Sequence, residues 1–161
     1  AYQDPEWRNH YRSTAAHSTL EVNGENAAEV FGAFRLGRRP ERTRLCQEDG
    51  WIVGRHDGYR HLGVMAERRL RLTDRGLEGQ DRLEGTSRPA IAYFHVHPAL
   101  ETALVESSTL SLGDGLVLKA DAGAFEEHAS FYAPFFGERK ENRSFRLPFK
   151  KQATWLIGRA A

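Results

Sequence analysis

The sequence predicts an all-β fold, a two-layer antiparallel β-sandwich that forms a single domain over residues 1–161. Three observations lead to this prediction. Apolar and polar residues alternate with a period of two in many short runs, which is typical of half-buried strands. Turn-forming pairs such as Asp49-Gly50 and Asp114-Gly115 separate these runs at short intervals. Apolar residues make up 40% of the chain, which is enough for a buried core.

The first predicted strands lie on either side of the pair Asn23-Gly24. Residues 19–22 alternate, and Asn-Gly is a strong hairpin signal because both residues tolerate a positive φ. We therefore expect the return strand of this hairpin over residues 29–37. A short helix over residues 25–34 is the alternative, although its length is marginal.

Two long strands are expected over residues 50–73, joined by a turn at Asp57-Gly58. In the second strand Leu70 and Leu72 alternate with Arg69 and Arg71, which is the period of two expected of a strand. Further strands are expected over residues 90–98, 115–120, 130–136, 145–149 and 153–158. So many short strands favour a sandwich or a barrel.

Composition and charge argue against several classes of protein. The formal net charge is +1, so neither nucleic acid nor a membrane is predicted as a partner. No apolar run is long enough to span a membrane. Cys46 is the only cysteine, so no disulfide can form within the chain. The chain shows no signal peptide and begins without Met, so we expect an excised piece of a longer protein. This leaves the localisation unknown, with the bacterial periplasm and the cytoplasm as the two alternatives for the parent.

Arginine dominates the cations and is clustered along the chain. The first cluster consists of Arg35, Arg38, Arg39, Arg42 and Arg44, and the second of Arg68, Arg69 and Arg71. Guanidinium groups pair bidentately with carboxylate or sulfate, so a local anion site is one interpretation. A solvated face of the fold is the other.

Histidines and a tyrosine are the candidate reactive groups. His95 and His97 lie two apart on a predicted strand and share a face, where they either bind a metal or pack beside Tyr93. His56 and Tyr59 lie at a predicted hairpin tip, a kind of position that often carries function. A tyrosine near cationic groups can donate or accept a proton. A solvated hairpin end is the alternative interpretation.

Five segments occur in a fixed order along the chain. They are RSTAAHSTLEVNG (12–24), EVFGAFRLGRR (29–39), GRHDGYRHLGV (54–64), ERRLRLTDRGLEGQDRLEG (67–85) and AIAYFHVHP (90–98). Together they resemble the heparinase II/III-like family of polysaccharide lyases, in particular its C-terminal β-sheet domain. The resemblance implies a two-part enzyme, in which an N-terminal α/α toroid packs on this sandwich and the substrate groove lies between them. It also implies β-elimination on a uronic-acid-containing, acidic polysaccharide such as heparan sulfate or alginate.

The resemblance also implies roles for individual residues. His17 matches a family histidine that binds a structural zinc in several members, and Tyr59 matches a tyrosine that faces the groove. Both are therefore expected to be catalytic residues. Whether His17 binds a metal, transfers a proton or only holds the local geometry stays open. Substrate binding is expected at Arg35, Arg38, Arg39 and His56.

Three departures from the family pattern bear on zinc. Ser18 stands where asparagine is usual, and Ala15 stands where some heparinases have a histidine. No histidine lies near Ala66, where the family often has a further zinc ligand. A zinc site needs three or four ligands, and only His17 matches one. No cofactor is therefore certain, the metal ligands are unknown, and a weak or absent zinc site is expected.

A second class of function competes with the lyase. A non-catalytic carbohydrate-binding or structural sandwich would show the same strands, whereas a long helical region before the chain would favour the lyase. For the lyase, the expected partners are an acidic polysaccharide and the N-terminal toroid of the parent chain. Because the groove needs both walls, residues 1–161 alone are expected to be inactive. The sequence does not define which polysaccharide is bound, or the oligomeric state.

Overall fold

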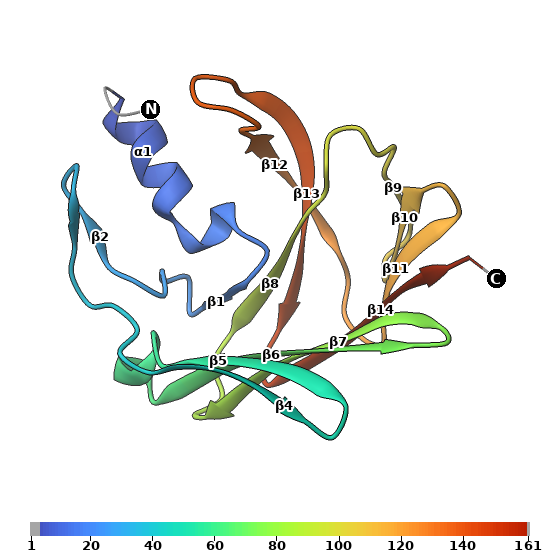
Figure 1. Cartoon of the computed structure of the whole chain (residues 1–161), viewed down its shortest axis with the longest axis horizontal. Helices are drawn as coiled ribbons and strands as arrows, with labels where there is room; N and C mark the ends of the chain where they lie inside the picture. Colours follow the sequence, from blue (N-terminus) through green and yellow to red (C-terminus); the bar gives the residue numbers. More distant parts are fainter. Residues whose placement is uncertain (1–3, 161) are drawn as a thin grey trace.

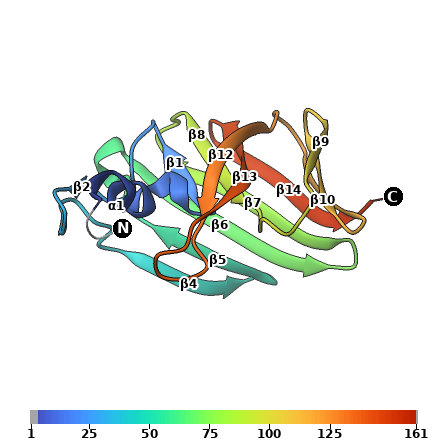
Figure 2. The same cartoon turned by 90° about the horizontal axis from the view of Figure 1, so that it is seen from above.

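A computed structural model describes residues 4–160 and contains two antiparallel β-sheets packed on each other (Figure 1). The larger sheet has eight strands and the smaller has four. Seen from above, the small sheet lies over the middle of the large one (Figure 2). This arrangement confirms the all-β, two-layer antiparallel sandwich predicted from the sequence.

The large sheet has the strand order β4-β5-β6-β7-β14-β11-β10-β9. Its strands are β4 (Thr43–Glu48), β5 (Trp51–His56), β6 (Val64–Thr73), β7 (Gly76–Gly85), β9 (Ala103–Glu106), β10 (Thr109–Gly113), β11 (Leu116–Ala120) and β14 (Gln152–Arg159). Strand β14 pairs with β7 on one side and with β11 on the other. It therefore joins the two halves of this sheet.

The small sheet has the strand order β1-β8-β13-β12. Its strands are β1 (Leu20–Val22), β8 (Ala90–His95), β12 (Glu126–Tyr132) and β13 (Lys140–Phe149). The remaining elements are helix α1 (Pro5–Arg12), the short 3₁₀ helices η1 (Thr14–Ala16) and η2 (Arg60–Leu62), and a two-stranded arm of β2 (Val30–Phe31) and β3 (Arg35–Leu36). Arg12 of α1 donates hydrogen bonds to the carbonyls of Gly32 and Arg35, which ties the arm to the helix.

Helix α1 begins with a capped first turn. The Asp4 side chain accepts hydrogen bonds from the backbone N–H groups of Glu6 and Trp7. Pro5 occupies the start of the helix, where its missing N–H is not needed. The strand-based prediction contains no helix here, although Asp-Pro-Glu is a helix-start signal. Among residues 4–160, no helix has the length and apolar content needed to cross a bilayer.

The core lies between the two sheets and follows from the alternation of side chains. Phe145 and Leu147 of β13 are fully buried on its inner face. Opposite them, the Trp155 ring of β14 meets Phe94 of β8 edge to face, with ring centroids 5.2 Å apart. Gly79 of β7 makes room for this indole, because a Cβ there would lie only 2.1 Å from it. A single glycine thus sets how closely the aromatic core packs on the large sheet.

A buried ion pair lies within this core. Arg68 of β6 donates two hydrogen bonds to Asp81 of β7, at 2.7 and 3.0 Å. The fully buried Asp81 also accepts a hydrogen bond from Trp155 Nε1 at 3.0 Å. The same guanidinium donates to the carbonyl of Ser18 at 2.7 Å and so connects the large sheet to the segment before β1. Such a buried charge is stable only while its partner is present.

The hairpin predicted around Asn23-Gly24 is wrong in its pairing. Both residues do adopt positive φ values, 57° and 70°, but β1 pairs with β8 and not with residues 29–37. Residues 29–37 instead contain the β2–β3 arm. The alternative helix over residues 25–34 is not formed either. Alternation shows that a segment is a strand, but it does not identify the partner strand.

Four strands of the large sheet, β4, β7, β9 and β10, are missing from the prediction. In β7 the polar residue Asp81 occupies an inward position, so the sequence does not show the regular alternation of apolar and polar residues there. All residues of β9 are exposed, so the sequence shows no apolar face there. The strand expected over residues 130–136 exists, but it is shifted toward the N-terminus and spans 126–132.

Candidate functional site

The outer face of the small sheet carries a group of histidine and tyrosine side chains. We call this group the histidine face; it consists of Tyr93, His95 and His128 on the strands and of His10 and His17 on the N-terminal segment. Tyr93 and His95 alternate with core residues of β8 and so point away from the large sheet. The Tyr93 ring centroid lies 6.3 Å from that of His95 and 6.0 Å from that of His128.

His95 is held at both ring nitrogens. Nε2 lies 2.9 Å from the carbonyl oxygen of Ala15, so Nε2 is the nitrogen that donates. Nδ1 accepts from the hydroxyls of Ser144 at 2.7 Å and Ser130 at 3.1 Å. Burial lowers the pKa of His95, and the neighbouring histidines lower it further, while the Ala15 carbonyl partly offsets this. The imidazole is therefore neutral at neutral pH.

His10 extends the same face from helix α1. Its ring lies edge-on to Trp7 at 5.6 Å and to Phe131 of β12 at 6.5 Å, measured between centroids. Burial lowers the pKa of His10, and the nearby His128 and His17 lower it further. Burial likewise lowers the pKa of His128. The fold thus gathers histidines in one region and disfavours their protonation.

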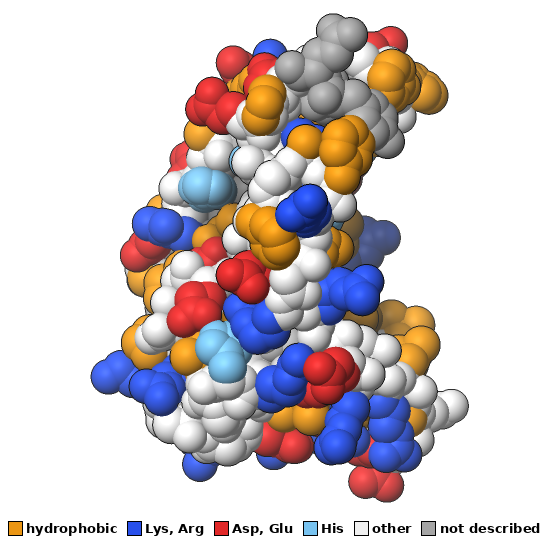
Figure 3. Space-filling view, turned by 90° about the vertical axis from the view of Figure 1, so that its left-hand side faces the viewer, with side chains coloured by type: hydrophobic (Ala, Val, Ile, Leu, Met, Phe, Trp, Pro, Cys, Tyr) orange, Lys and Arg blue, Asp and Glu red, His pale blue; other side chains and the backbone are white. Residues whose placement is uncertain are grey.

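His17 is the exposed member of the group. It follows η1, and its backbone N–H donates to the carbonyl of Thr14 at 3.1 Å. Its Nε2 lies 3.1 Å from the carbonyl oxygen of Tyr11, which orients the ring and leaves Nδ1 as the nitrogen able to accept a proton. Figure 3 looks onto the left-hand side of Figure 1, where histidine side chains reach the surface among acidic and basic ones.

Tyr93 and Glu21 add further titratable groups beside the histidines. Tyr93 Oη lies 3.5 Å from Glu21 Oε1. Burial raises the pKa of Tyr93, and Glu21 raises it further. Burial also raises the pKa of Glu21, against the effects of Tyr93 and Arg146. A cavity of about 400 Å³ adjoins Glu21, with Ile91 among its lining residues.

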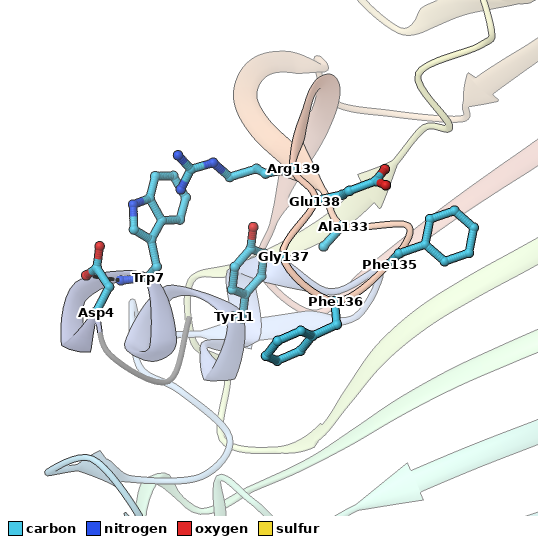
Figure 4. A pocket seen from close by; sticks show the side chains of 9 residues that line it. All are labelled: Asp4, Trp7, Tyr11, Ala133, Phe135, Phe136, Gly137, Glu138 and Arg139. Atoms are coloured by element: carbon cyan, nitrogen blue, oxygen red, sulfur yellow. Dashed lines mark hydrogen bonds between the residues drawn. The ribbon is translucent and has the colours of Figure 1, made fainter.

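An aromatic cavity of about 570 Å³ lies between α1 and the loop that joins β12 to β13 (Figure 4). Trp7 and Tyr11 line it from the helix, and Phe135 and Phe136 line it from the loop. The Arg139 guanidinium covers the Trp7 ring at 3.7 Å from its centroid. Exposed aromatic rings beside a cation provide an apolar surface with a polar edge. Such a surface suits the ring faces and hydroxyls of a sugar.

Tyr59 does not face a groove, so that expectation is wrong. Its side chain is fully buried in the core, and its hydroxyl donates to the carbonyls of Leu20, at 2.9 Å, and Glu25, at 3.2 Å. Burial raises the pKa of Tyr59 to about 12. Leu20 comes three residues after His17, so both predicted residues lie near the start of β1. Of the two predicted catalytic residues, His17 is open to a ligand and Tyr59 is not.

Two of the four predicted substrate-binding residues hold the backbone together. The Arg38 guanidinium donates to the carbonyls of Gly58 and Ala27, which joins the loop before β2 to the turn after β5. His56 Nδ1 accepts from the backbone N–H of Gly58 at 3.2 Å, and burial lowers the pKa of this histidine. The Arg38 guanidinium and the His56 imidazole therefore bond within the protein, although both were expected to bind the substrate.

The other two predicted residues remain open to a ligand. Arg35 lies on β3 with an exposed side chain, and its carbonyl accepts from Arg12. Arg39 is also exposed, and its carbonyl accepts from Arg60. The four residues therefore divide into an inner pair with structural contacts and an outer pair on the surface.

The residues around His17 do not fit a zinc site. Within residues 4–160, no group of three or more His, Cys, Asp and Glu side chains is placed to hold a metal. At the position where the family often has another ligand, Ala66 is buried in the core. The nearby Arg68 already bonds to the Ser18 carbonyl, so a cation holds the segment next to His17. The Ser18 carbonyl and the Asp81 carboxylate therefore already bind the Arg68 guanidinium, and they do not form a zinc site with His17.

The pair His95 and His97 is resolved in favour of packing. β8 ends at His95, which stacks beside Tyr93 as the packing interpretation predicted. His97 lies beyond the strand, against the Tyr132 ring at 4.9 Å. The sequence analysis missed His128, although EEHASFY contains the alternation that places it on one face with Ser130.

Together, the fold and the site define an antiparallel β-sandwich module with a polar, histidine-bearing outer face. A family model described as "Heparinase II/III-like, C-terminal" matches residues 1–156. The chain therefore belongs to this family. This match confirms the resemblance seen in the five ordered segments.

Solved structures with the same fold include lyases. Heparan sulfate lyase HepC from Pedobacter heparinus matches 96% of this chain with a TM-score of 0.69 and 13% identity. A structure of heparinase III matches 98% with a TM-score of 0.69 and 12% identity, and another heparinase III, with methylated lysines, matches 96% with a TM-score of 0.70 and 16% identity. The matched part is only 25–26% of those chains. No curated protein sequence matches the chain.

Proposed function

We propose that this chain is the C-terminal sandwich of a polysaccharide lyase that cleaves an acidic, uronate-containing polysaccharide by β-elimination. The observation that carries the proposal is His17, an exposed histidine that lies next to half-buried histidines with lowered pKa values in a heparinase II/III-like domain. The similarity to structures titled heparan sulfate lyase and heparinase III supports a sulfated or carboxylated substrate.

The reaction sets clear demands on the site. The uronate carboxylate must be neutralised, the proton at C5 must be removed, and the leaving glycosidic oxygen must gain a proton. His17 can serve in one of the two proton transfers, because Nδ1 is open and Nε2 is fixed by the Tyr11 carbonyl. The exposed Arg35 and Arg39 are the proposed partners of substrate anions, because guanidinium binds carboxylate and sulfate bidentately.

The aromatic cavity beside α1 is the proposed contact for the sugar rings. Trp7 and Tyr11 lie on the same N-terminal segment as His17, so this segment presents both a stacking surface and a proton-transfer group. Removing water from such a surface would strengthen the electrostatic contacts made there.

An N-terminal α/α toroid is the proposed opposite wall of the groove. General acid–base catalysis contributes roughly 10²–10⁴-fold, and only when the group is positioned against the substrate. A half-groove cannot position it in this way. We therefore expect the longer protein that carries this domain to cleave the polysaccharide, and residues 1–161 alone to bind it weakly without turnover.

A non-catalytic carbohydrate-binding module is the second candidate function. The aromatic cavity favours it, because stacking and hydrogen bonding there need no second domain. The two candidates differ in one measurable product, the unsaturated uronate that β-elimination leaves behind.

The test follows ultraviolet absorbance of unsaturated uronate with heparan sulfate, alginate and hyaluronan. The longer protein should form product, and His17→Ala in it should reduce the rate by roughly 10²–10⁴-fold. His97→Ala is the matched control and should retain the rate, because His97 lies beyond the end of β8 against Tyr132. Absence of product from the longer protein, together with retained binding, would favour the binding module.

A further inference from the structure

The outer face of the large sheet carries a row of basic side chains that faces away from the histidine face. The strand registers place five residues side by side on β4, β5, β6, β7 and β14. They are Arg44, Arg55, Glu67, Arg82 and Gln152. Neighbouring strands lie roughly 4.8 Å apart, so the row spans about 19 Å. Its direction is perpendicular to the strands, across the surface of the sheet.

Alternation fixes which way this row points. On β6 the inward side chains include Ala66 of the core and Arg68 of the buried ion pair. Glu67 lies between them and points outward, as do its register partners Arg55 and Arg82. The row therefore lies on the surface opposite to the small sheet, and one ligand cannot touch both this row and His17 without passing around an edge of the sandwich.

Two carboxylates hold the guanidinium groups of this surface in place. Glu67 is fully buried, bonds to Arg55 and lies 3.5 Å from Arg82 and 3.7 Å from Arg69. Glu48 receives two hydrogen bonds from Arg55, at 2.9 and 3.0 Å. Arg55, Arg69 and Arg82 thus share two carboxylates. Arg44, which lies beside Arg55 in the strand register, adds a fourth positive charge, so these four arginines exceed the two carboxylates by two charges.

The excess positive charge is accessible on either side of the ion pair between Arg55 and Glu67. Arg44 on β4 is exposed, and the side chain of Arg82 on β7 is 37% exposed. Arg55 lies between them and is anchored by both carboxylates. Glu67 also holds Arg82 at 3.5 Å, so Arg82 loses less side-chain entropy when it binds a planar anion bidentately.

We propose that this row, Arg44–Arg55–Arg82, is a second binding site for a linear acidic polysaccharide, separate from the face that carries His17. The choice of polysaccharide rests on the proposed function, and one further observation supports it. Proteins that bind single-stranded nucleic acid use exposed aromatic rings for base stacking. Here Trp51, the aromatic side chain on this surface, is only 9% exposed and is covered by Arg69 and Arg71, at 5.6 and 4.4 Å from the ring.

A site of this kind would hold the polymer while another part of it occupies the groove. Two linked contacts raise the effective concentration of the second one, so affinity for long chains would exceed that for short ones. The site should therefore affect KM for polymeric substrate more than it affects kcat. Its binding should also weaken as salt rises, because exposed charges are screened.

The test measures binding of the 161-residue chain to heparin chains by titration calorimetry at low and high salt. The double variant Arg44→Gln/Arg82→Gln should weaken binding about tenfold at low salt, as expected when two charge-assisted contacts are lost. The matched control is Arg75→Gln/Lys119→Gln, which removes the same charge outside the row, from the turn between β6 and β7 and from β11 of the same sheet. It should change affinity less than twofold. Circular dichroism and thermal unfolding check that both variants fold.

Several results would overturn the proposal. These are equal affinity of the wild type and the row variant, an equal loss in the control, no binding of the wild type at low salt, or tighter binding of a single-stranded oligonucleotide of equal charge. The lyase proposal fails on a different measurement, the absence of unsaturated product. A failure of one proposal can therefore be told apart from a failure of the other.

Discussion

On the outer face of the small sheet, burial keeps histidines neutral, whereas on the outer face of the large sheet burial encloses a carboxylate among arginines. His95 is held by two serine hydroxyls and a carbonyl, none of which carries a charge. Glu67 is surrounded by Arg55, Arg69 and Arg82. One face therefore has half-buried imidazoles whose protonation is disfavoured, and the other has fixed positive charges that can bind anions.

This difference teaches how one sandwich can present two kinds of polar surface. An imidazole whose partners are neutral responds to pH near its own pKa. A guanidinium stays charged at any physiological pH, so its contacts respond to salt instead. We expect the two faces to be separable in experiments that vary pH and salt, and the following predictions test that separation from the largest effect to the smallest.

The largest effect is expected between the two faces, at the buried pair Arg68–Asp81. Asp81→Asn would leave the guanidinium without its charged partner, and we expect a loss of about 3–5 kcal/mol in the free energy of unfolding. Chemical denaturation followed by tryptophan fluorescence and by circular dichroism measures it. The two signals should shift together, because the pair connects both sheets. Separate transitions would mean that the faces belong to independently folding units.

The next largest effect is expected on the large sheet at Glu67. Glu67→Gln removes the charge that three arginines share, and we expect a loss of about 2 kcal/mol in the free energy of unfolding. Because the arginines would then repel one another, part of the stability should return at high salt. Denaturant titrations at low and high salt measure this. Glu84→Gln, an exposed change on the neighbouring strand β7, is the control and should stay within about 0.5 kcal/mol.

A smaller effect is expected from Tyr59→Phe. The change removes the hydroxyl that bonds to the carbonyls of Leu20 and Glu25, and we expect a loss of about 1 kcal/mol in the free energy of unfolding. Thermal unfolding measures the stability, and the ultraviolet assay on the longer protein measures the rate. A rate that falls by orders of magnitude without a change in stability would return Tyr59 to the catalytic residues.

The smallest effect concerns pH and the histidine face. Because the pKa values of His10, His95 and His128 lie below the ordinary 6.5 when folded, the unfolded chain binds more protons as the pH falls below about 7. Their contribution to stability is thus complete above the unfolded pKa and decreases toward pH 5. His95→Asn should make this decrease shallower by at most one proton. Melting temperatures between pH 5 and 8 measure it, and an unchanged slope would contradict the assignment.

The sequence was sufficient for the sandwich because alternation and turn pairs are local signals. The turn at Asn23-Gly24 was identifiable for the same reason, yet its strand found its partner in β8, a choice made by packing across the whole fold. Tyr59 shows the same limit for the site: sequence similarity marked its position, but only the surrounding core shows that its hydroxyl is used internally. His128 and Tyr93 could have been paired only by knowing that β8 and β12 flank β13.

Strand β14 has a consequence for how this chain is made. It leaves the ribosome after both of its partners, β7 and β11, and it bridges these two strands within the large sheet. Until residues 152–159 emerge, the growing chain carries two open sheet edges and lacks the indole of Trp155 that packs against Phe94. Open edges pair readily with other chains. Translation therefore delivers an aggregation-prone intermediate whose protection depends on how quickly β14 follows its two partner strands.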